Sequence, residues 1–129
     1  MQSQAKVRQL VKEGRLEFLN GGWVASDEAC PTFEDLIMNI LTGNSFLMRE
    51  FGVQPKVAWH CDPFGHSGVT VDLFAKMGYE TLFFSRVDDD EKVWRKNNQL
   101  MEFVWQPVYE TPEGPIKSKH SLFTHVMHA

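Results

Sequence analysis

The segment of eight residues from His60 to Ser67 (HCDPFGHS) concentrates the residue types that chemistry needs. It holds one carboxylate, two imidazoles and an aromatic ring. Zinc accepts oxygen and nitrogen ligands, so Asp62 beside the histidines is a residue mix that suits a metal site. Pro63 and Gly65 favour a tight turn, which can aim Asp62 into a crevice. An Asp-Pro turn that only caps the local backbone explains the same residues, and spacing alone favours that interpretation.

This segment falls between a predicted strand and a predicted helix. Val57 to Cys61 reads as a buried strand, Ser67 can cap the helix that follows, and Gly78 ends that helix. In open α/β sheets, ligands bind outside the carboxyl ends of the strands, so residues directly after a strand are the first candidates. We expect the inward face of the helix to consist of Thr70, Leu73, Phe74 and Met77.

The most regular helical pattern runs from residue 33 to residue 51. Thr32 and Asp35 mark its start, Gly52 marks its end, and Gly43 inside it is expected to be a mild cost. Its apolar stripe, at offsets 0, 3, 4, 7, 8, 14, 15 and 18, consists of Phe33, Leu36, Ile37, Ile40, Leu41, Leu47, Met48 and Phe51.

Shorter elements surround these two helices. A helix that ends at Gly14, a strand over 15–19 and a turn over 20–22 open the chain. The later elements are a strand over 81–84, a charged helix over 88–98, a strand over 101–108, a loop over 110–119 and an apolar patch over 122–127. The order strand, helix, strand, helix, strand predicts an α/β fold with a mostly parallel sheet flanked by helices.

The composition is that of a globular domain and excludes several classes of protein. The 129 residues are 43% hydrophobic and 23% charged, which excludes disordered, collagen-like and coiled-coil chains. Thirteen Lys and Arg against seventeen Asp and Glu give a net charge of -4 with the basic residues scattered, so nucleic acid is not an expected partner. No apolar run approaches the roughly 20 residues that cross a bilayer, so no membrane span is expected.

The aromatic and cysteine contents add two observations. Ten Phe, four Trp and two Tyr are many for so short a chain, so some should face a pocket or another part of a larger protein. Cys30 and Cys61 are too few for a disulfide framework and lack the C-x-x-C spacing. The redox compartment therefore stays undecided.

Four segments, taken in order, resemble the consecutive motifs of one enzyme family: RLEFLNGGWVASDEA, VAWHCDPFGHS, LFAKMGYETLFFSR and MEFVWQP. They are similar to the family 38 glycoside hydrolases, the retaining α-mannosidases of lysosomes and the Golgi, and most similar to the lysosomal branch. The most specific part is DPFGHS with GGW upstream and Arg86 downstream. The resemblance runs from about Val7 to Met127 and implies that residues 1–129 are an internal fragment of the N-terminal catalytic domain, a larger (β/α) domain.

The resemblance implies a role for three residues. Asp62 matches the catalytic nucleophile, which is also a ligand of the zinc ion (Zn2+). Phe64 matches the aromatic residue that lines the same pocket. Arg86, 24 residues after Asp62, matches the arginine that contacts the reacting carboxylate and the sugar. That role is physically reasonable because a guanidinium group can orient and stabilise a carboxylate.

Other residues of the motifs are expected to support the site. His66-Ser67 matches the family motif and is interpreted as a supporting shell or a helix cap. His60 is not expected to be a ligand, because the family often has an apolar residue there. Gly21-Gly22 of the GGW motif should permit a close backbone approach, and Asp27-Glu28 are expected to be at most pocket-rim or cap residues.

The implied function is hydrolysis of terminal α-linked mannose from mannose-containing oligosaccharides such as N-glycans, by zinc-dependent double displacement. The family's His-x-Asp pair, a later histidine and its acid/base aspartate have no match in this chain. A zinc site needs at least three protein ligands, and a retaining glycosidase needs two carboxylates about 5 Å apart. The isolated chain is therefore expected to be inactive without the rest of the mannosidase chain, and the family implies the lysosome or the secretory pathway.

Two other functions stay open at this point. A different metal-dependent carbohydrate hydrolase, such as a sugar deacetylase, would use Asp62 and a histidine to hold a metal-bound water. A non-catalytic truncated product would bind mannose or a partner weakly, or do neither. A covalent glycosyl adduct on Asp62 would exclude the first, and the flanking sequence would decide the second.

Overall fold

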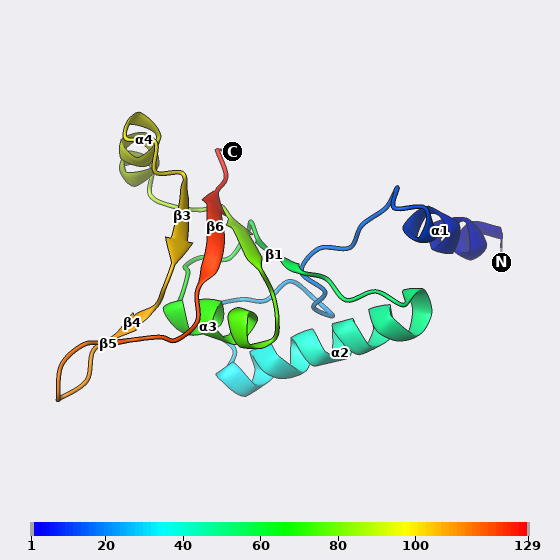
Figure 1. Ribbon diagram of the computed structural model, residues 1–129, viewed down its shortest axis with the longest axis horizontal. Helices are drawn as coiled ribbons and strands as arrows, with labels where there is room; N and C mark the ends of the chain where they lie inside the picture. The colour runs from blue at the N-terminus through cyan, green and yellow to red at the C-terminus, as the bar shows by residue number, and fades with distance from the viewer. Residues whose placement is uncertain (1, 129) are drawn as a thin grey trace.

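The structure, a computed structural model, describes residues 2–128, with side chains from Ser3 onward. Its elements in chain order are α1 (Gln2–Lys12), α2 (Phe33–Phe51), β1 (Val57–His60), α3 (Gly68–Lys76), β2 (Thr81–Phe84), α4 (Asp89–Asn97), β3 (Glu102–Trp105), β4 (Val108–Tyr109), β5 (Ile116–Lys117) and β6 (Leu122–Val126). Figure 1 shows an elongated arrangement, with α1 at one end and the β4–β5 hairpin at the other.

The central sheet has the strand order β1-β2-β6-β3. Strands β1, β2 and β6 run parallel, and β3 pairs with β6 in the antiparallel direction. The prediction of an α/β fold with a mostly parallel sheet is confirmed. The predicted strand over 101–108 is instead split into β3 and β4, because Pro107 lies between them and has no N–H to donate to a ladder.

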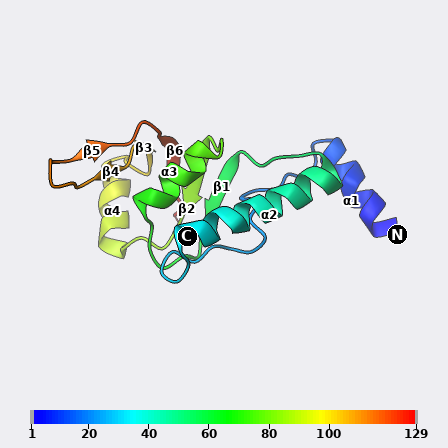
Figure 2. The same ribbon diagram turned by 90° about the horizontal axis from the view of Figure 1, so that it is seen from below.

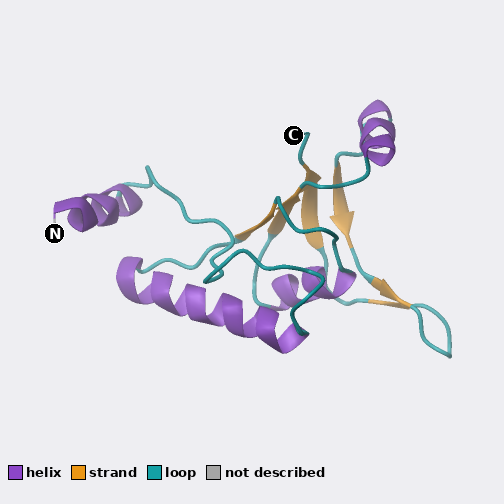
Figure 3. Cartoon of the chain, turned by 180° about the vertical axis from the view of Figure 1, so that it is seen from behind, coloured by secondary structure: helices purple, strands orange, loops and turns teal. Residues whose placement is uncertain are grey.

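Helices α2 and α3 lie side by side on one face of the sheet (Figure 3). The core between them combines Ile40 of α2, Val71 and Phe74 of α3, and the inward strand residues Ala58, Leu82, Leu122 and Val126. The opposite face carries Trp59, Val104 and Phe123, which are 40%, 66% and 48% exposed. Helices flank the sheet as expected, and α2 and α3 both lie on one of its faces.

Helix α2 begins and ends where the sequence predicts. Thr32 and Asp35 form a reciprocal capping box, and Gly52 closes the helix in the left-handed region with φ of 69°. Only part of its apolar stripe is covered. Ile40 and Leu47 are buried, whereas several other members face solvent, with 55% exposure at Phe33 and 49% at Leu41 and Met48.

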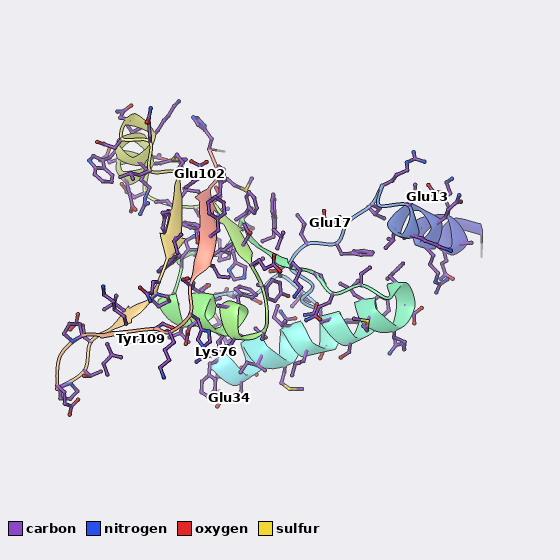
Figure 4. All side chains as sticks on the ribbon, viewed as in Figure 1. Glu13, Glu17, Glu34, Lys76, Glu102 and Tyr109 are labelled. Carbon is purple, nitrogen blue, oxygen red and sulfur yellow. The ribbon has the colours of Figure 1, made fainter. Side chains whose placement is uncertain are left out.

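Helix α3 is capped by Ser67 as predicted, because the Ser67 hydroxyl accepts a hydrogen bond from the Val69 amide at 3.1 Å. Its buried face differs from the prediction, since it consists of Thr70, Val71, Asp72 and Phe74, with Leu73 and Met77 only half-buried. The difference arises because Asp72 turns toward Ser118, and its carboxylate accepts a hydrogen bond from the Ser118 hydroxyl and pairs with Lys76 at 2.8 Å. Figure 4 shows Lys76 on α3.

The predicted strand over 15–19 is wrong, because this segment has no strand to pair with. The amides of Arg15 and Leu16 donate instead to the carbonyl of Leu10 at the end of α1. Its apolar alternation reflects packing on α2, where the rings of Phe18 and Phe51 have centroids 4.8 Å apart. Figure 2 shows α1 beside the far end of α2, where Arg8 also reaches the Glu50 carboxylate at 2.8 Å, as the same packing requires.

Gly43 allows the backbone of another segment to approach α2 closely, so its role is more than the mild destabilisation of the helix that the sequence suggests. A Cβ atom at this position would overlap the carbonyl oxygen of Gly21 and would lie 2.6 Å from the amide nitrogen of Trp23. Gly21 itself has φ of 77°, which L side chains rarely adopt. The expectation that Gly21-Gly22 allow a close approach is confirmed, and the partner in that approach is α2.

No helix among the residues that the structure describes is long and apolar enough to span a bilayer.

We expect Gly43→Ala to destabilise the domain by about 2 kcal/mol, because the added methyl group must displace backbone atoms of the Gly21–Trp23 turn. Thermal denaturation of the full-length protein measures the effect. Ser45→Ala, an exposed change on the same helix, is the control and should leave the melting temperature unchanged. Equal melting temperatures for the two variants would contradict the close contact.

We expect the isolated chain of residues 1–129 to self-associate, because the open sheet face presents apolar side chains to water. Size-exclusion chromatography with light scattering should show oligomers, and Val104→Lys should reduce them. Met38→Lys, on an exposed position of α2, is the matched control. A sharp, reversible two-state transition of a monodisperse monomer would contradict this prediction.

Candidate active site

The carboxyl ends of the three parallel strands meet at one edge of the sheet. The loops after β1 and β2 lie at this edge together with Met127, which follows β6. The Met127 amide donates to the Phe84 carbonyl at 2.8 Å, and the sulfur atoms of Cys61 and Met127 lie 3.0 Å apart. The candidate residues after β1 and β2 are therefore neighbours in space, as the strand order requires.

Asp62 and Arg86 form an ion pair at this edge. The Nε and Nη2 atoms of Arg86 lie 2.7 Å and 2.5 Å from Oδ1 of Asp62. Both contacts fall on one oxygen, so Oδ2 takes no part in the pair. Arg86 has φ of 51°, a left-handed backbone conformation that is uncommon for a residue other than glycine. This turn redirects the chain after β2 and places the guanidinium group against Asp62.

Phe64 completes the group of three candidate residues. The guanidinium carbon of Arg86 lies 4.8 Å from the centre of the Phe64 ring, within the range of a cation–π contact. The side chain of Asp62 is 79% exposed and Phe64 is 73% exposed. Exposed ion pairs add little to stability, so this arrangement matters for geometry more than for folding. The three residues lie together, and their catalytic and binding roles stay predictions.

A cavity of about 290 Å³ opens beside Asp62. Its walls come from two segments, and the lining residues are Ala25, Ser26, Asp27, Trp59, His60, Cys61, Asp62, Pro63 and Phe64. Its volume lies at the lower end of the range for ligand pockets. The combination of an exposed carboxylate with aromatic rings suits a small polar ligand that has one apolar face.

Segment 23–26, of which Ala25 and Ser26 line one wall of the cavity, is held by Asn39 of α2. The Trp23 amide donates to the Asn39 carbonyl at 3.1 Å, and the Val24 amide donates to Asn39 Oδ1 at 3.0 Å. The Nδ2 group of Asn39 donates to the Val24 carbonyl and to the Ser26 hydroxyl at 3.0 Å and 2.9 Å. Helix α2 therefore positions this wall of the cavity.

Glu28 lies behind the cavity and joins three parts of the chain. One oxygen, Oε2, accepts hydrogen bonds from the Ser67 amide at 2.9 Å and from the Thr70 hydroxyl at 3.0 Å. The other oxygen, Oε1, lies 3.3 Å from Nδ1 of His60. The side chains of Glu28 and His60 are only 6% and 3% exposed. We refer to Glu28, His60, Ser67 and Thr70 as the Glu28 cluster.

The hydrogen bonds determine the charge of Glu28. Burial alone would raise its pKa, but the bonds from His60, Ser67 and Thr70 outweigh burial and lower the pKa below its ordinary value. Glu28 is therefore ionised at neutral pH. The expectation that Asp27-Glu28 are rim or cap residues holds for Asp27, whose carboxylate accepts from the Ala29 amide at 2.6 Å. It is wrong for Glu28, which is an interior hydrogen-bond acceptor.

One sequence signal could have pointed to this cluster. His60 lies in a segment that predicts a buried strand, and a buried imidazole needs a polar partner. The sequence does not show which residue that partner is, because Glu28 lies 32 positions earlier in the chain.

His66 links the loop after β1 to the loop after β2. Its Nε2 atom lies 2.7 Å from the carbonyl oxygen of Ser85, and its ring centre lies 4.3 Å from that of Phe84. Burial is the largest influence on His66 and lowers its pKa, so the ring is neutral at pH 7. A neutral ring must carry its proton on Nε2 to donate to Ser85, which is the residue before Arg86.

Within the described part of the chain, Glu28, His60 and His66 also offer three potential metal ligands whose atoms lie within 4.8 Å of one another. Glu28 already accepts three hydrogen bonds and Nε2 of His66 donates to Ser85, whereas Nε2 of His60 has no hydrogen-bond partner among the described residues. A metal ion would have to displace these bonds. We therefore interpret the group as a hydrogen-bond cluster.

Asp62 fits a zinc ion as one ligand, because its carboxylate is exposed and one oxygen is outside the Arg86 pair. Of the nearest histidines in sequence, His60 is buried with Nδ1 against Glu28, and His66 donates to Ser85 through Nε2. Asp62 is not part of the group of three potential ligands found among residues 2–128, whereas zinc sites use at least three ligands from the protein.

Comparison with known proteins identifies the family of this chain. Residues 1–129 match the N-terminal domain of glycosyl hydrolases family 38. A lysosomal alpha-mannosidase of Cavia porcellus is 47% identical over 107 residues, which are 81% of this chain and 11% of that protein. A lysosomal alpha-mannosidase of Dictyostelium discoideum is 39% identical over 95% of this chain, and the human epididymis-specific alpha-mannosidase is 40% identical over 98%.

The chain thus has an α/β fold with an exposed carboxylate at the carboxyl edge of its parallel strands. It belongs to glycosyl hydrolase family 38 and corresponds to part of its N-terminal domain. It spans about a ninth of the length of the relatives that it matches, whose shares are 11% and 12%.

We expect Arg86→Lys to lower kcat/KM of the full-length protein toward an aryl α-mannoside by roughly tenfold or more, equivalent to about 1.4 kcal/mol. Lysine keeps the charge but cannot place two nitrogen atoms on Asp62 and a planar group over Phe64. The melting temperature should change little, because both partners are largely exposed.

Arg95→Lys is the matched control for this change. Arg95 also pairs with an acid, Glu91, at 2.8 Å and lies 4.8 Å from the ring centre of Phe103, but it does so on α4. Its substitution should leave the kinetics unchanged. Full activity of the Arg86→Lys variant would contradict the predicted role of Arg86 in the active site.

Proposed function

We propose that the full-length protein containing this chain hydrolyses terminal α-linked mannose in mannose-containing oligosaccharides, with retention of configuration. The observation that carries the proposal is the exposed Asp62 carboxylate, held by Arg86 beside Phe64 at the carboxyl edge of the sheet. The family to which the chain belongs supports glycoside hydrolysis as the reaction class, and the names of the relatives support mannose as the sugar.

The proposed reaction has two displacements, and Asp62 is the nucleophile of the first. Its carboxylate oxygen forms a bond to the anomeric carbon while the glycosidic C–O bond breaks. The leaving oxygen takes a proton from a carboxylic acid that lies outside residues 1–129. Water then attacks the same carbon, gives its proton to that carboxylate, and releases mannose and the free Asp62 carboxylate.

Arg86 and Phe64 would support these steps. The guanidinium group orients the carboxylate, because two of its nitrogen atoms contact Oδ1. Phe64 would face the sugar ring and exclude water from one side of the cavity. Neither role requires a change in protonation of Arg86.

We further propose that the enzyme uses zinc, with Asp62 as one ligand and the remaining ligands outside this chain. When bound, zinc would supply Lewis-acid binding of sugar hydroxyl groups. The exposed carboxylate supports this assignment. The burial of His60 and the hydrogen bond from His66 to Ser85 argue against a deacetylase-type site that needs a histidine beside Asp62 on one metal.

We propose that this chain forms an internal part of the N-terminal catalytic domain. The rest of the mannosidase chain would then cover the open sheet face that carries Trp59, Val104 and Phe123. Several relatives are named lysosomal alpha-mannosidases, which supports the lysosome or the secretory pathway as the location of the full-length protein. On this view, residues 1–129 alone are inactive.

We expect Asp62→Asn in the full-length protein to abolish hydrolysis of an aryl α-mannoside and to lower the zinc content. The amide preserves the size of the side chain, but it cannot form the glycosyl ester and is a poorer metal ligand. Steady-state kinetics and elemental analysis after dialysis measure the two effects.

Asp89→Asn, at an exposed position in the first turn of α4, is the control and should retain both activity and zinc. Near wild-type turnover of Asp62→Asn would refute the assignment of the nucleophile. Unchanged zinc content with lost turnover would refute only the role of Asp62 as a ligand.

A further inference from the structure

The loop that carries Asp62 and Phe64 is bracketed by a single buried carboxylate. We propose that Glu28 and His60 are positioning residues for Asp62, an inference that rests on the proposed function. His60 precedes Asp62 by two residues and ends β1, while Ser67 follows Asp62 by five residues and caps α3. Both residues bind Glu28, so one side chain holds both ends of the loop.

The loop between these two ends depends on them for its position. Asp62 and Phe64 are both more than 70% exposed, and Gly65 has φ of 145° with open space around it. Residues this exposed contribute little packing of their own. The direction in which Asp62 points is therefore set mainly where the loop leaves β1 and where it enters α3.

Burial makes the Glu28 cluster a firm anchor. Water has little access to the Glu28–His60 pair, so no solvent molecule can replace a lost bond at low cost. The Nε2 atom of His60 is buried without a hydrogen-bond partner among the described residues. Glu28 is thus the polar contact that holds the imidazole ring in place, while Phe74 packs edge-on against it at 5.1 Å.

The anchor extends to Arg86 through His66. Ser67, which binds Glu28, is the neighbour of His66, and His66 reaches the carbonyl of Ser85. Ser85 is the residue before Arg86. The same buried group therefore fixes the loops of both partners in the Asp62–Arg86 pair, so a displaced Glu28 cluster would change the distance between carboxylate and guanidinium.

This role predicts a defect in the chemical step, because misplacing a nucleophile by about 1 Å costs much more in rate than in binding. The test uses the full-length protein and compares Glu28→Gln, Glu28→Ala and Asp72→Asn. Glutamine keeps the size of the side chain and one oxygen for Ser67 and Thr70, so it is the variant expected to fold. Figure 4 shows the outward position of Glu34, whose change to Gln serves as a surface control.

Asp72 is the matched control because it is also a buried acid, and it lies on α3. Its carboxylate pairs with Lys76 and accepts a hydrogen bond from Ser118, and neither partner belongs to the loop that carries Asp62. A merely structural role for Glu28 would make the two substitutions equivalent. Both would then lower the melting temperature without altering kcat per folded molecule.

We expect Glu28→Gln to lower kcat toward an aryl α-mannoside by roughly tenfold with KM changed less than about threefold, and Glu28→Ala to lower it further. Asp72→Asn and Glu34→Gln should keep kcat within about twofold. Hydrogen–deuterium exchange of the peptide spanning residues 61–66 should accelerate in the two Glu28 variants alone. An unchanged kcat in Glu28→Gln, or an equal loss in Asp72→Asn, would overturn the proposal.

The exchange measurement separates this proposal from the proposed function. If the wild-type protein does not hydrolyse mannosides, the proposed function fails, and the positioning role is judged on exchange alone. Faster exchange of 61–66 in Glu28→Gln but not in Asp72→Asn would still support it, whereas equal exchange in both would overturn it.

Discussion

The backbone of the Gly21-Gly22 turn lies against Gly43 of α2 with no side chain between them. That approach brings the next residues within reach of Asn39, which fixes segment 23–26 through its backbone and side chain. Glu28 follows directly, and its carboxylate can then reach β1 and α3. A turn held one side chain farther from α2 would withdraw Glu28 from these partners, so the site depends on this glycine contact.

The two parts of the site differ in how they are stabilised. The Glu28 cluster is buried, and its charge is compensated by hydrogen bonds that solvent cannot easily replace. The Asp62–Arg86 pair is exposed and competes with water, so it cannot hold its own geometry against thermal motion. The role of nucleophile that we propose for Asp62 needs this exposure. The structure places its buried, hydrogen-bonded residues beneath the loop and leaves the Asp62 carboxylate at the surface.

Local signals in the sequence predicted most helices and strands, but they did not predict the contacts between residues far apart in the chain. The capping residues of α2 and α3 act within a few positions, so Thr32 and Ser67 were identified correctly. The pairing of Glu28 with His60, and the insertion of β6 between β2 and β3, depend on the fold as a whole. The segment over 15–19 was predicted as a strand from its alternating apolar residues. That prediction is wrong because no neighbouring strand is available for it to pair with.

Strand β1 shows why the site is open in this chain. Ala58 and His60 point toward α2 and α3, where they join the core and the Glu28 cluster, while Trp59 points to the opposite face and lines the cavity. Trp59 packs on Phe83, which in turn packs on His125, to form a row across three parallel strands with no described helix above it. One face of the sheet thus supplies the rigid support, and the other supplies a wall of the cavity. A substrate bound against Asp62 would contact this chain at Trp59, at Phe64 and along residues 25–27. Under the proposed function, the second carboxylate would approach from the uncovered side.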